Sequence, residues 1–271
     1  MQIIQTETND GVMTITLTRP EHLNAFNQAM LDELLTVLDE ADYNDDVRAI
    51  IITGDGKAFC AGSDLEGGAS AFVDNETPPD KYRDTGGTLA LRLYEMKKPI
   101  IAAINGAAVG VGITMTLPMD IRIASEKAKM GFVFASRGIV PESCSGWFLP
   151  RIVGISTACD WVYSGRIIPA EEAKQAGLVS EVVPPEELLP LAREKAKRIA
   201  EQTSAVSIAL SRQLMWKMLG ANHPEESHRL ESKMIQWAGS RPDAKEGVSS
   251  FLEKRNPQFT MKVSKDMPSF F

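Results

Sequence analysis

Two short runs of apolar, mostly β-branched or small residues set the strongest limit on what this chain can fold into. Residues 47–54 (VRAIIITG) and 100–104 (IIAAI) are each followed by a loop rich in glycine and other small residues. Continuous apolar runs of this length, closed by turn residues, are typical of strands that helices cover on both faces. The two runs therefore predict the buried strands of an α/β core.

Other segments alternate around these two strands. Residues 2–7 and 12–18 have alternating, β-branched patterns on either side of Asn9-Asp10-Gly11, which predicts a β-hairpin. From 25 to 41 the apolar residues recur every three or four positions, which predicts a helix with Asn24 as its N-cap. Further expectations are a short helix starting near Val111, a strand at 120–124, helices at 155–164 and 170–176, a strand at 178–183 and an almost continuous helical pattern over 186–255.

Strands that alternate with helices, followed by helices alone, predict an α/β core with an α-helical C-terminal domain. The chain has 271 residues, of which 44% are hydrophobic, so it can bury a large core. We place the core in residues 1–195 and the helical domain in residues 196–271. Pro184-Pro185 marks the joint that precedes the helical region.

Charge and composition exclude several classes of function. The formal net charge is −7 and no cluster of Lys or Arg forms a basic stripe, so nucleic acid is not the expected partner. The N-terminus has no signal-peptide pattern, and no apolar run reaches the roughly eighteen residues that a membrane span needs. We therefore expect a cytoplasmic protein that does not enter a membrane.

Cysteine and histidine spacing gives no indication of a metal site. Cys60, Cys144 and Cys159 are odd in number and lack CxxC spacing, so we interpret them as reduced thiols. The histidines, His22, His223 and His228, lack the i, i+4 pairing of a helical metal site. No metal ligands are therefore expected.

Two loops contain the residues best placed for chemistry. Residues 61–64 (AGSD) and 105–112 (NGAAVGVG) follow the two buried strands, and their backbone N–H groups could converge on a developing oxyanion. Glycine turns that only join strands to helices are the alternative. The dinucleotide fingerprint is absent from GAAVGVG (106–112), the phosphate loop from GDGKAF (54–59) and the serine-hydrolase elbow from ESCSG (142–146). Residues 66–87 lack periodicity and predict an exposed loop that covers a binding site.

Several separated segments, in order, resemble the crotonase superfamily, also called the enoyl-CoA hydratase/isomerase family. They span nearly the whole chain: 16–26 (TLTRPEHLNAF), 47–65 (VRAIIITGDGKAFCAGSDL), 98–125 (KPIIAAINGAAVGVGITMTLPMDIRIAS), 138–154 (GIVPESCSGWFLPRIVG), 164–183 (SGRIIPAEEAKQAGLVSEVV) and 251–255 (FLEKR). The resemblance implies a ClpP/crotonase-like ββα spiral with a helical C-terminal domain that assembles trimers or dimers of trimers. It also implies an acyl-CoA thioester substrate of fatty acid metabolism, with no cofactor beyond the coenzyme A of that substrate.

The resemblance also assigns residues. It implies that the backbone N–H groups of Ser63 and Val111 hold the thioester carbonyl. Phe251 and Lys254 correspond to positions that reach coenzyme A from a neighbouring subunit. The resemblance implies coenzyme A-binding positions at Ala25, Ala61, Asp64, Leu65, Phe251 and Lys254. We add Gly110, Phe134 and Trp147 as candidate substrate-binding residues. From the residues alone, an Asp such as Asp64 in a glycine turn more often binds local amides than takes part directly in chemistry.

The chain departs from the family pattern at the two glutamates that hydratases use to add water. Thr114 and Phe134 occupy those positions, and neither can act as a carboxylate acid or base. The stretch PESCSGW instead resembles single-glutamate Δ3,Δ2-enoyl-CoA isomerases, which implies that Glu142 moves a proton between two carbons. Alternatives are a single-glutamate hydratase, with Ser143, Ser145 or Thr114 positioning the water, and a non-catalytic member that binds coenzyme A or RNA.

The environment of Glu142 is also an expectation. An apolar pocket near Phe134, Trp147 and Phe148 would raise the pKa of Glu142, which suits a carboxylate that shuttles protons. The alternative is that Glu142 caps the helix that begins nearby or pairs with Arg137 or Arg151.

Overall fold

The computed structural model describes residues 3–66, 68, 72, 74 and 76–271. Its larger sheet has the strand order β1-β2-β3-β5-β7-β10. The strands are β1 (Ile4–Asn9), β2 (Val12–Leu17), β3 (Ala49–Gly54), β5 (Ile100–Ile104), β7 (Ile121–Ser125) and β10 (Glu181–Val183). β1 and β2 form an antiparallel hairpin, and every other neighbouring pair of this sheet is parallel.

Three strands of the larger sheet each continue into a strand of a second, smaller sheet. It has the order β4-β6-β8-β9 and consists of β4 (Ala58–Cys60), β6 (Ala107–Val109), β8 (Lys129–Gly131) and β9 (Ile167–Pro169). β3 leads directly into β4, β5 into β6, and β7 into β8. Because β3 and β5 are parallel neighbours, as are β4 and β6, the loops after β4 and β6 emerge side by side.

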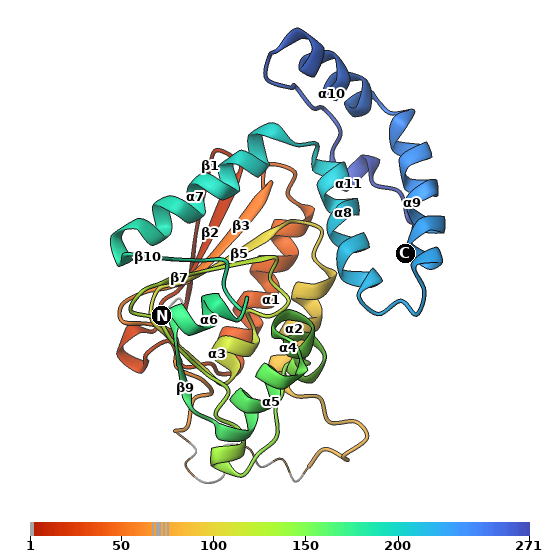
Figure 1. Cartoon of the computed structure of the whole chain (residues 1–271). Helices are drawn as coiled ribbons and strands as arrows, with labels where there is room; N and C mark the ends of the chain where they lie inside the picture. Colours follow the sequence, from red (N-terminus) through yellow and green to blue (C-terminus); the bar gives the residue numbers. More distant parts are fainter. Residues whose placement is uncertain (1–2, 67, 69–71, 73, 75) are drawn as a thin grey trace.

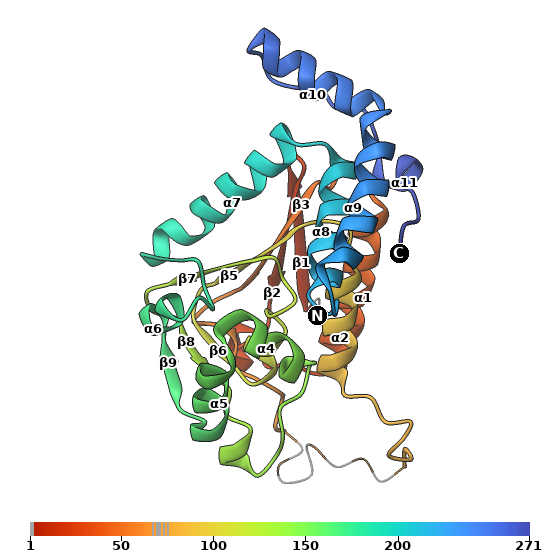
Figure 2. The same ribbon diagram turned by 45° about the vertical axis from the view of Figure 1, so that its right-hand side comes forward.

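Helices cover both faces of the larger sheet, which explains its continuous apolar strands. Ile50 and Ile52 of β3 belong to the core formed with α1 (Gln28–Tyr43) and α2 (Thr85–Glu95). Ile51, which points the other way, packs in the cluster that contains the alanines of α7 (Pro185–Gln202). Figures 1 and 2 show α7 on one side of the sheet and α1 with α2 on the other. Burying each such isoleucine contributes about 1.5–3 kcal/mol.

The C-terminal helices form a separate small core. Val206 and Leu210 of α8 (Ala205–Met218) pack against Met234 of α9 (Pro224–Gly239). α10 (Pro242–Glu253) and α11 (Val263–Asp266) follow, and α10 projects away from the sheets in Figure 1. The buried Arg212 of α8 donates to the Leu93 carbonyl near the end of α2 at 2.8 Å and pairs with Asp120 at 2.9 Å. This residue joins the helical region to the core.

Most expected elements are confirmed, with differences in their limits. The hairpin, the helix over 155–164, which is α5 (Ile155–Ser164), and α6 (Ala170–Gln175) lie where the patterns predict, although residue 2 lies outside the described residues. The strand expected over 178–183 is shorter and begins at residue 181. α3 (Val111–Thr114) is a single turn. The boundary placed between 195 and 196 falls inside the continuous helix α7 and stays a prediction.

The expectation that Asn24 caps the first helix is wrong. α1 begins at Gln28, and the Asn27 side chain accepts from Met30 N. Asn24 is fully buried and donates instead to the carbonyls of Asp55 and Ala58, at 2.9 and 2.8 Å. A 3₁₀ turn over Pro20–His22 comes before the helix. Residue 24 adopts a positive φ outside the right-handed helical region, so the helix cannot start there.

The loop expected over 66–87 ends earlier than predicted. α2 begins at Thr85 and is capped by the Asp84 side chain, so the last three residues of that range are helical. Residues 67, 69–71, 73 and 75 of the range lie outside the described residues. Among the helices that the structure describes, none combines the length and the apolar character needed to cross a membrane.

Candidate active site

The loops after β4 and β6 bring two backbone N–H groups to one place. Cys60 at the end of β4 pairs with Ala108 of β6, so Ser63 and Val111 follow adjacent parallel strands. Gly110 has φ +55° and ψ −126°, a conformation that suits glycine and that turns the chain into α3. Among the described residues, neither Ser63 N nor Val111 N has an acceptor, and both residues line the same cavity. Two such donors can hold an oxyanion.

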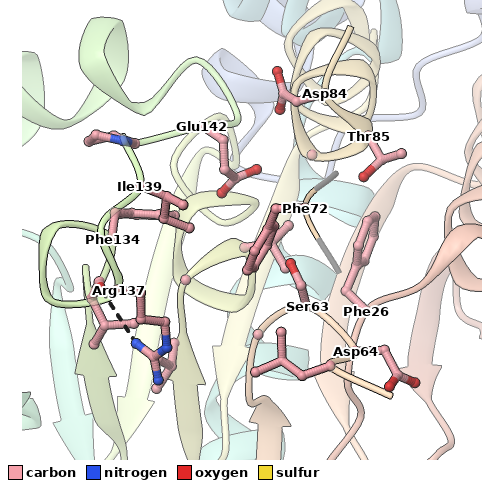
Figure 3. A pocket seen from close by; sticks show the side chains of 18 of the residues that line it. Phe26, Ser63, Asp64, Phe72, Asp84, Thr85, Phe134, Arg137, Ile139 and Glu142 are labelled. Atoms are coloured by element: carbon pink, nitrogen blue, oxygen red, sulfur yellow. Dashed lines mark hydrogen bonds between the residues drawn. The ribbon is translucent and has the colours of Figure 1, made fainter. Parts of the chain in front are cut away.

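The cavity has a volume of about 760 Å³. Its walls combine apolar side chains, among them Phe26, Phe134 and Ile139, with the two loops just described. Figure 3 shows Glu142 pointing into it from one side and Ser63 with Asp64 lying across from it. Four described residues of the lining carry carboxylates, and these differ in their partners: Asp64, Asp74, Asp84 and Glu142.

Glu142 is held by two side-chain hydroxyls. Thr114 Oγ1 lies 2.7 Å from Glu142 Oε1, closer than the 3.2 Å that separates it from the Gly110 carbonyl, so the carboxylate is its better acceptor. The Ser143 hydroxyl donates to Oε2. Thr114 and Ser143 are fully buried, so both donors are fixed in place. Each carboxylate oxygen therefore has one hydroxyl donor.

The surroundings of Glu142 raise its pKa, as the sequence predicted. Burial is the largest cause, because it penalises the charged form. The hydroxyls of Ser143 and Thr114 stabilise the charged form and oppose the rise, whereas the nearby Asp84 carboxylate adds to it. The result is a carboxyl group that takes up a proton more readily than a solvated glutamate.

A strained turn sets the direction of the Glu142 side chain. Ser143 and Cys144 both have positive φ, 56° and 55°, which costs free energy in residues with a Cβ. Ser143 N donates to Asp84 Oδ1 at 3.1 Å, and Ser145 Oγ donates to the Glu142 carbonyl at 2.6 Å. These bonds offset the strain and lead into α4 (Ser145–Val153).

The alternative partners considered for Glu142 are not its partners here. The cap position of α4 is Cys144, and Glu142 contributes only its carbonyl to this turn. Arg137 donates to the Val133 carbonyl at 3.3 Å. The Arg151 guanidinium lies 4.1 Å from the centre of the Trp147 ring.

The other three carboxylates of the cavity have structural partners. Asp64 forms an ion pair with Arg19 at 2.9 Å. Burial is the largest single influence on the pKa of Asp64 and raises it, but the hydrogen bonds from Arg19 and Glu66 N and the charge of Arg19 together lower it. Asp74 accepts from the backbone N–H groups of the following residues 76 and 77. Asp84 accepts from Gly87 N at the start of α2 and from Ser143 N.

The structure brings together eight of the twelve residues assigned from the sequence. The cavity is lined by Ala61, Ser63, Asp64, Leu65, Gly110, Val111, Phe134 and Glu142. Ala25 lies beside Phe26, with its carbonyl bound to Arg19, and is not part of the lining. Trp147 points instead into an aromatic cluster, with its ring centre 6.0 Å from that of Tyr94 and 4.8 Å from that of Phe148.

Phe251 lies on α10 and Lys254 follows its last residue, and neither belongs to the cavity lining. Phe251 is 81% exposed, and Lys254 ends the helix with a positive φ. Their assignment depends on a neighbouring subunit and stays a prediction.

Sequence reasoning missed several lining residues. They include Phe26, Phe72, Tyr82, Asp84, Gly86 and Arg137. Asp84-Thr85-Gly86-Gly87 could have been recognised as a helix start, because an Asp cap is a known signal. Within the described part of the chain, no cluster of three or more His, Cys, Asp or Glu residues could hold a metal ion.

Comparisons with known proteins agree on the type of protein that this chain resembles. The sequence model described as enoyl-CoA hydratase/isomerase matches residues 7–262. Enoyl-CoA hydratase ACTT3 of Alternaria alternata is 45% identical over 251 residues, which cover 92% of this chain and 83% of that protein. The 1,2-epoxyphenylacetyl-CoA isomerase of Escherichia coli K12 is 36% identical, with 97% and 100% covered.

A solved structure confirms the expected fold. The crystal structure of an enoyl-CoA hydratase from Bacillus anthracis superposes with a TM-score of 0.87 at 31% identity, covering 95% of this chain and 99% of that chain. The crotonase-type α/β core with C-terminal helices is thus confirmed.

Proposed function

The chain belongs to the enoyl-CoA hydratase/isomerase family, and from this premise we propose that it moves a double bond within an enoyl-CoA thioester, with Glu142 as the single proton shuttle. Glu142 removes a proton from the carbon next to the thioester carbonyl and returns it two carbons further along. No cofactor is proposed beyond the coenzyme A that the substrate carries.

The two loops supply the electrostatic part of this mechanism. Loss of the first proton shifts negative charge onto the thioester oxygen and forms a dienolate. The backbone N–H groups of Ser63 and Val111 donate to that oxygen in the proposed complex, and such donors stabilise developing charge most effectively in a site closed to water. Phe134 and Ile139 provide the apolar wall beside the reacting carbons.

The observation that carries the proposal is the state of Glu142. Among the described lining residues, it is the carboxylate whose pKa is raised and whose donors are side-chain hydroxyls rather than a cation or backbone N–H groups. A base with a raised pKa is better matched to proton transfer near neutral pH. One base is sufficient for a 1,3-shift, provided that it reaches both carbons.

Hydration of a 2-enoyl-CoA is the second candidate. Its support is the relative named an enoyl-CoA hydratase at 45% identity. The hydroxyls of Thr114 and Ser143 already donate to Glu142, and Ser145 donates to a backbone carbonyl. Because these three hydroxyls are engaged, a water added during hydration would be held mainly by the carboxylate itself.

The test compares wild type with Glu142→Gln on 3-enoyl-CoA and 2-enoyl-CoA, with products followed by mass and by NMR. We expect a product of unchanged mass from the 3-enoyl substrate, and kcat lower by roughly a hundredfold to ten thousandfold in the variant. Glu40→Gln, an exposed residue on α1, is the matched control and should keep full activity.

Three outcomes would count against the proposal. Turnover of the 2-enoyl substrate alone, with a product heavier by one water, would favour the hydratase. Undiminished isomerisation by Glu142→Gln would exclude Glu142 as the shuttle. Calorimetric binding of acyl-CoA without turnover across chain lengths would favour a non-catalytic member.

We also propose that the protein is a homotrimer or a dimer of trimers in the cytoplasm, with Phe251 and Lys254 reaching coenzyme A bound by a neighbour. The support is one face of α10, where the exposed Val248, Phe251 and Leu252 follow the i, i+3, i+4 spacing of a single helix face. Large exposed apolar patches are typical of interaction surfaces. The enoyl-CoA substrate places the proposed activity in fatty acid metabolism.

A further inference from the structure

The Asp84 carboxylate joins two segments that the chain separates by more than fifty residues. Its Oδ1 accepts from Gly87 N, so that Asp84 is the N-cap of α2. The same oxygen accepts from Ser143 N at 3.1 Å. Ser143 belongs to the strained turn that directs Glu142 into the cavity. Asp84 therefore fixes the position of this turn relative to the start of α2.

Glu142 rests against the same helix start. A Cβ on Gly86 would lie 1.9 Å from Glu142 Oε2 and 2.2 Å from Ser143 Oγ, so the carboxylate is packed directly on the bare Cα of Gly86. Figure 3 shows Asp84 and Thr85 at the end of the cavity from which Glu142 projects. The carboxylates of Asp84 and Glu142 are thus two like charges at one helix start.

Few other titratable groups face Glu142. Cys60, at the end of β4, has its pKa raised to about 12 by burial, so its thiol is neutral. Cys144, in the turn itself, also has a raised pKa, caused first by burial and then by the charges of Asp84 and Glu142. The nearby lining cation, Arg137, is bound to the Val133 carbonyl. Among the described residues, Asp84 is the charged side chain that contributes to the raised pKa of Glu142.

We propose that Asp84 is a positioning residue for the reaction: it holds the 142–145 turn in place and puts a negative charge beside Glu142, so that Glu142 retains the proton it has taken up. This inference rests on the proposed role of Glu142 as the shuttle. Asp84 itself is assigned no contact with the reacting carbons.

The two tasks of Asp84 can be separated by substitution. Asparagine caps helices about as well as aspartate and keeps an oxygen that can accept from Ser143 N. Asp84→Asn therefore removes only the charge, and the pKa of Glu142 should fall. Asp84→Ala removes both the charge and the acceptor, so the strained turn loses its support.

The experiment measures kcat/KM for 3-enoyl-CoA against pH in wild type, Asp84→Asn and Asp84→Ala, with the exposed Asp46→Asn as control. The acid limb should move to lower pH in Asp84→Asn, because the pKa of Glu142 falls when the neighbouring negative charge is removed. In Asp84→Ala we expect kcat to fall by roughly tenfold to a hundredfold while KM changes little, because misplacement of the base affects chemistry more than binding. Circular dichroism establishes that each variant is folded.

A second readout does not require turnover. The titration of the Glu142 carboxyl carbon is followed by ¹³C NMR in wild type and Asp84→Asn, and the signal is assigned by its loss in Glu142→Gln. An unchanged titration would overturn the electrostatic role, and an unchanged kcat in Asp84→Ala would overturn the positioning role. If wild type fails to isomerise the substrate, the proposed function fails, while the NMR titration still decides whether Asp84 acts on Glu142.

Discussion

The pKa of Glu142 is set by a balance between groups that favour its charged form and groups that oppose it. Burial and the Asp84 carboxylate raise its pKa, and the hydroxyls of Ser143 and Thr114 lower it. From the resemblance we predicted that Thr114 occupies a position where family hydratases carry a glutamate, and that its hydroxyl could position a water in a hydratase. The structure gives Thr114 a contact of its own, with the remaining carboxylate.

Removing the Thr114 hydroxyl should shift this balance in a defined direction. In Thr114→Val the shape of the buried side chain is kept, but Oε1 loses the donor that stabilises the charged form. The pKa of Glu142 should therefore rise further. We expect the acid limb of the pH–rate profile to move to higher pH, opposite to the shift in Asp84→Asn. A shift in the same direction for both variants would contradict this balance.

The predictability of single residues depended on what marks them in the sequence. Glu142, Ser63 and Val111 were found because they lie in segments that resemble the family. Asp84 and Gly86 could not be found in this way, because their significance comes from contacts with a turn 59 residues from Asp84 in sequence. Trp147 was assigned to the substrate site on proximity to Glu142, but the helical path of α4 turns it toward Tyr94.

At the scale of elements, the contact between α2 and the 142–145 turn decides how the base is presented. The first turn of α2 has two consecutive glycines, and the carboxylate of Glu142 occupies the space that a side chain at position 86 would need. Helix propensity alone would favour alanine there. The contact with Glu142 explains why a glycine is required.

Gly86→Ala should therefore reduce activity by displacing Glu142. Because the Cβ would lie 1.9 Å from Oε2, the side chain or the turn must move. We expect kcat to fall by about a hundredfold, as for a base misplaced by about 1 Å. Gly239→Ala, where no atom lies within 4 Å, should leave kcat unchanged and gain up to about 1 kcal/mol in urea unfolding. Equal kcat values for the two variants would contradict the packing described.

Elements with a clear period or a long apolar run were predictable, and the very short strands were not. The central strands, the hairpin and α5 follow directly from their patterns. The second sheet was missed because β4, β6, β8 and β9 have three residues each, too few to show an alternation. Two of these short strands, β4 and β6, set the loops of Ser63 and Val111 side by side.

At the scale of the whole molecule, the order of strands and helices predicted the α/β core and the helical C-terminal region. The relation between subunits is the part that one chain leaves open. α10 exposes Val248, Phe251 and Leu252 at 62%, 81% and 73%, a surface that one chain alone does not cover. This exposure is expected if α10 packs against a second copy.

An acidic substitution on this surface should separate the subunits. Phe251→Asp places a charge in the proposed interface, and burying it there would cost several kcal/mol. We expect light scattering to give the mass of a trimer or hexamer for wild type and a smaller mass for the variant. Tyr43→Asp, at an exposed position at the end of α1, should keep the wild-type mass. A monomeric wild type would refute the proposed assembly.

In the proposed mechanism one carboxylate carries a proton from one carbon of the substrate to another, so a label on that proton should follow it. A 3-enoyl-CoA labelled with deuterium at C2 is converted in ordinary water, and the product is analysed for deuterium at C4. Glu142 is partly buried and lies between two buried hydroxyls, which slows exchange of its proton with solvent. We therefore predict that part of the label arrives at C4 and that Glu142→Gln abolishes the transfer. Efficient conversion with no deuterium at C4, unaffected by Glu142→Gln, would contradict it.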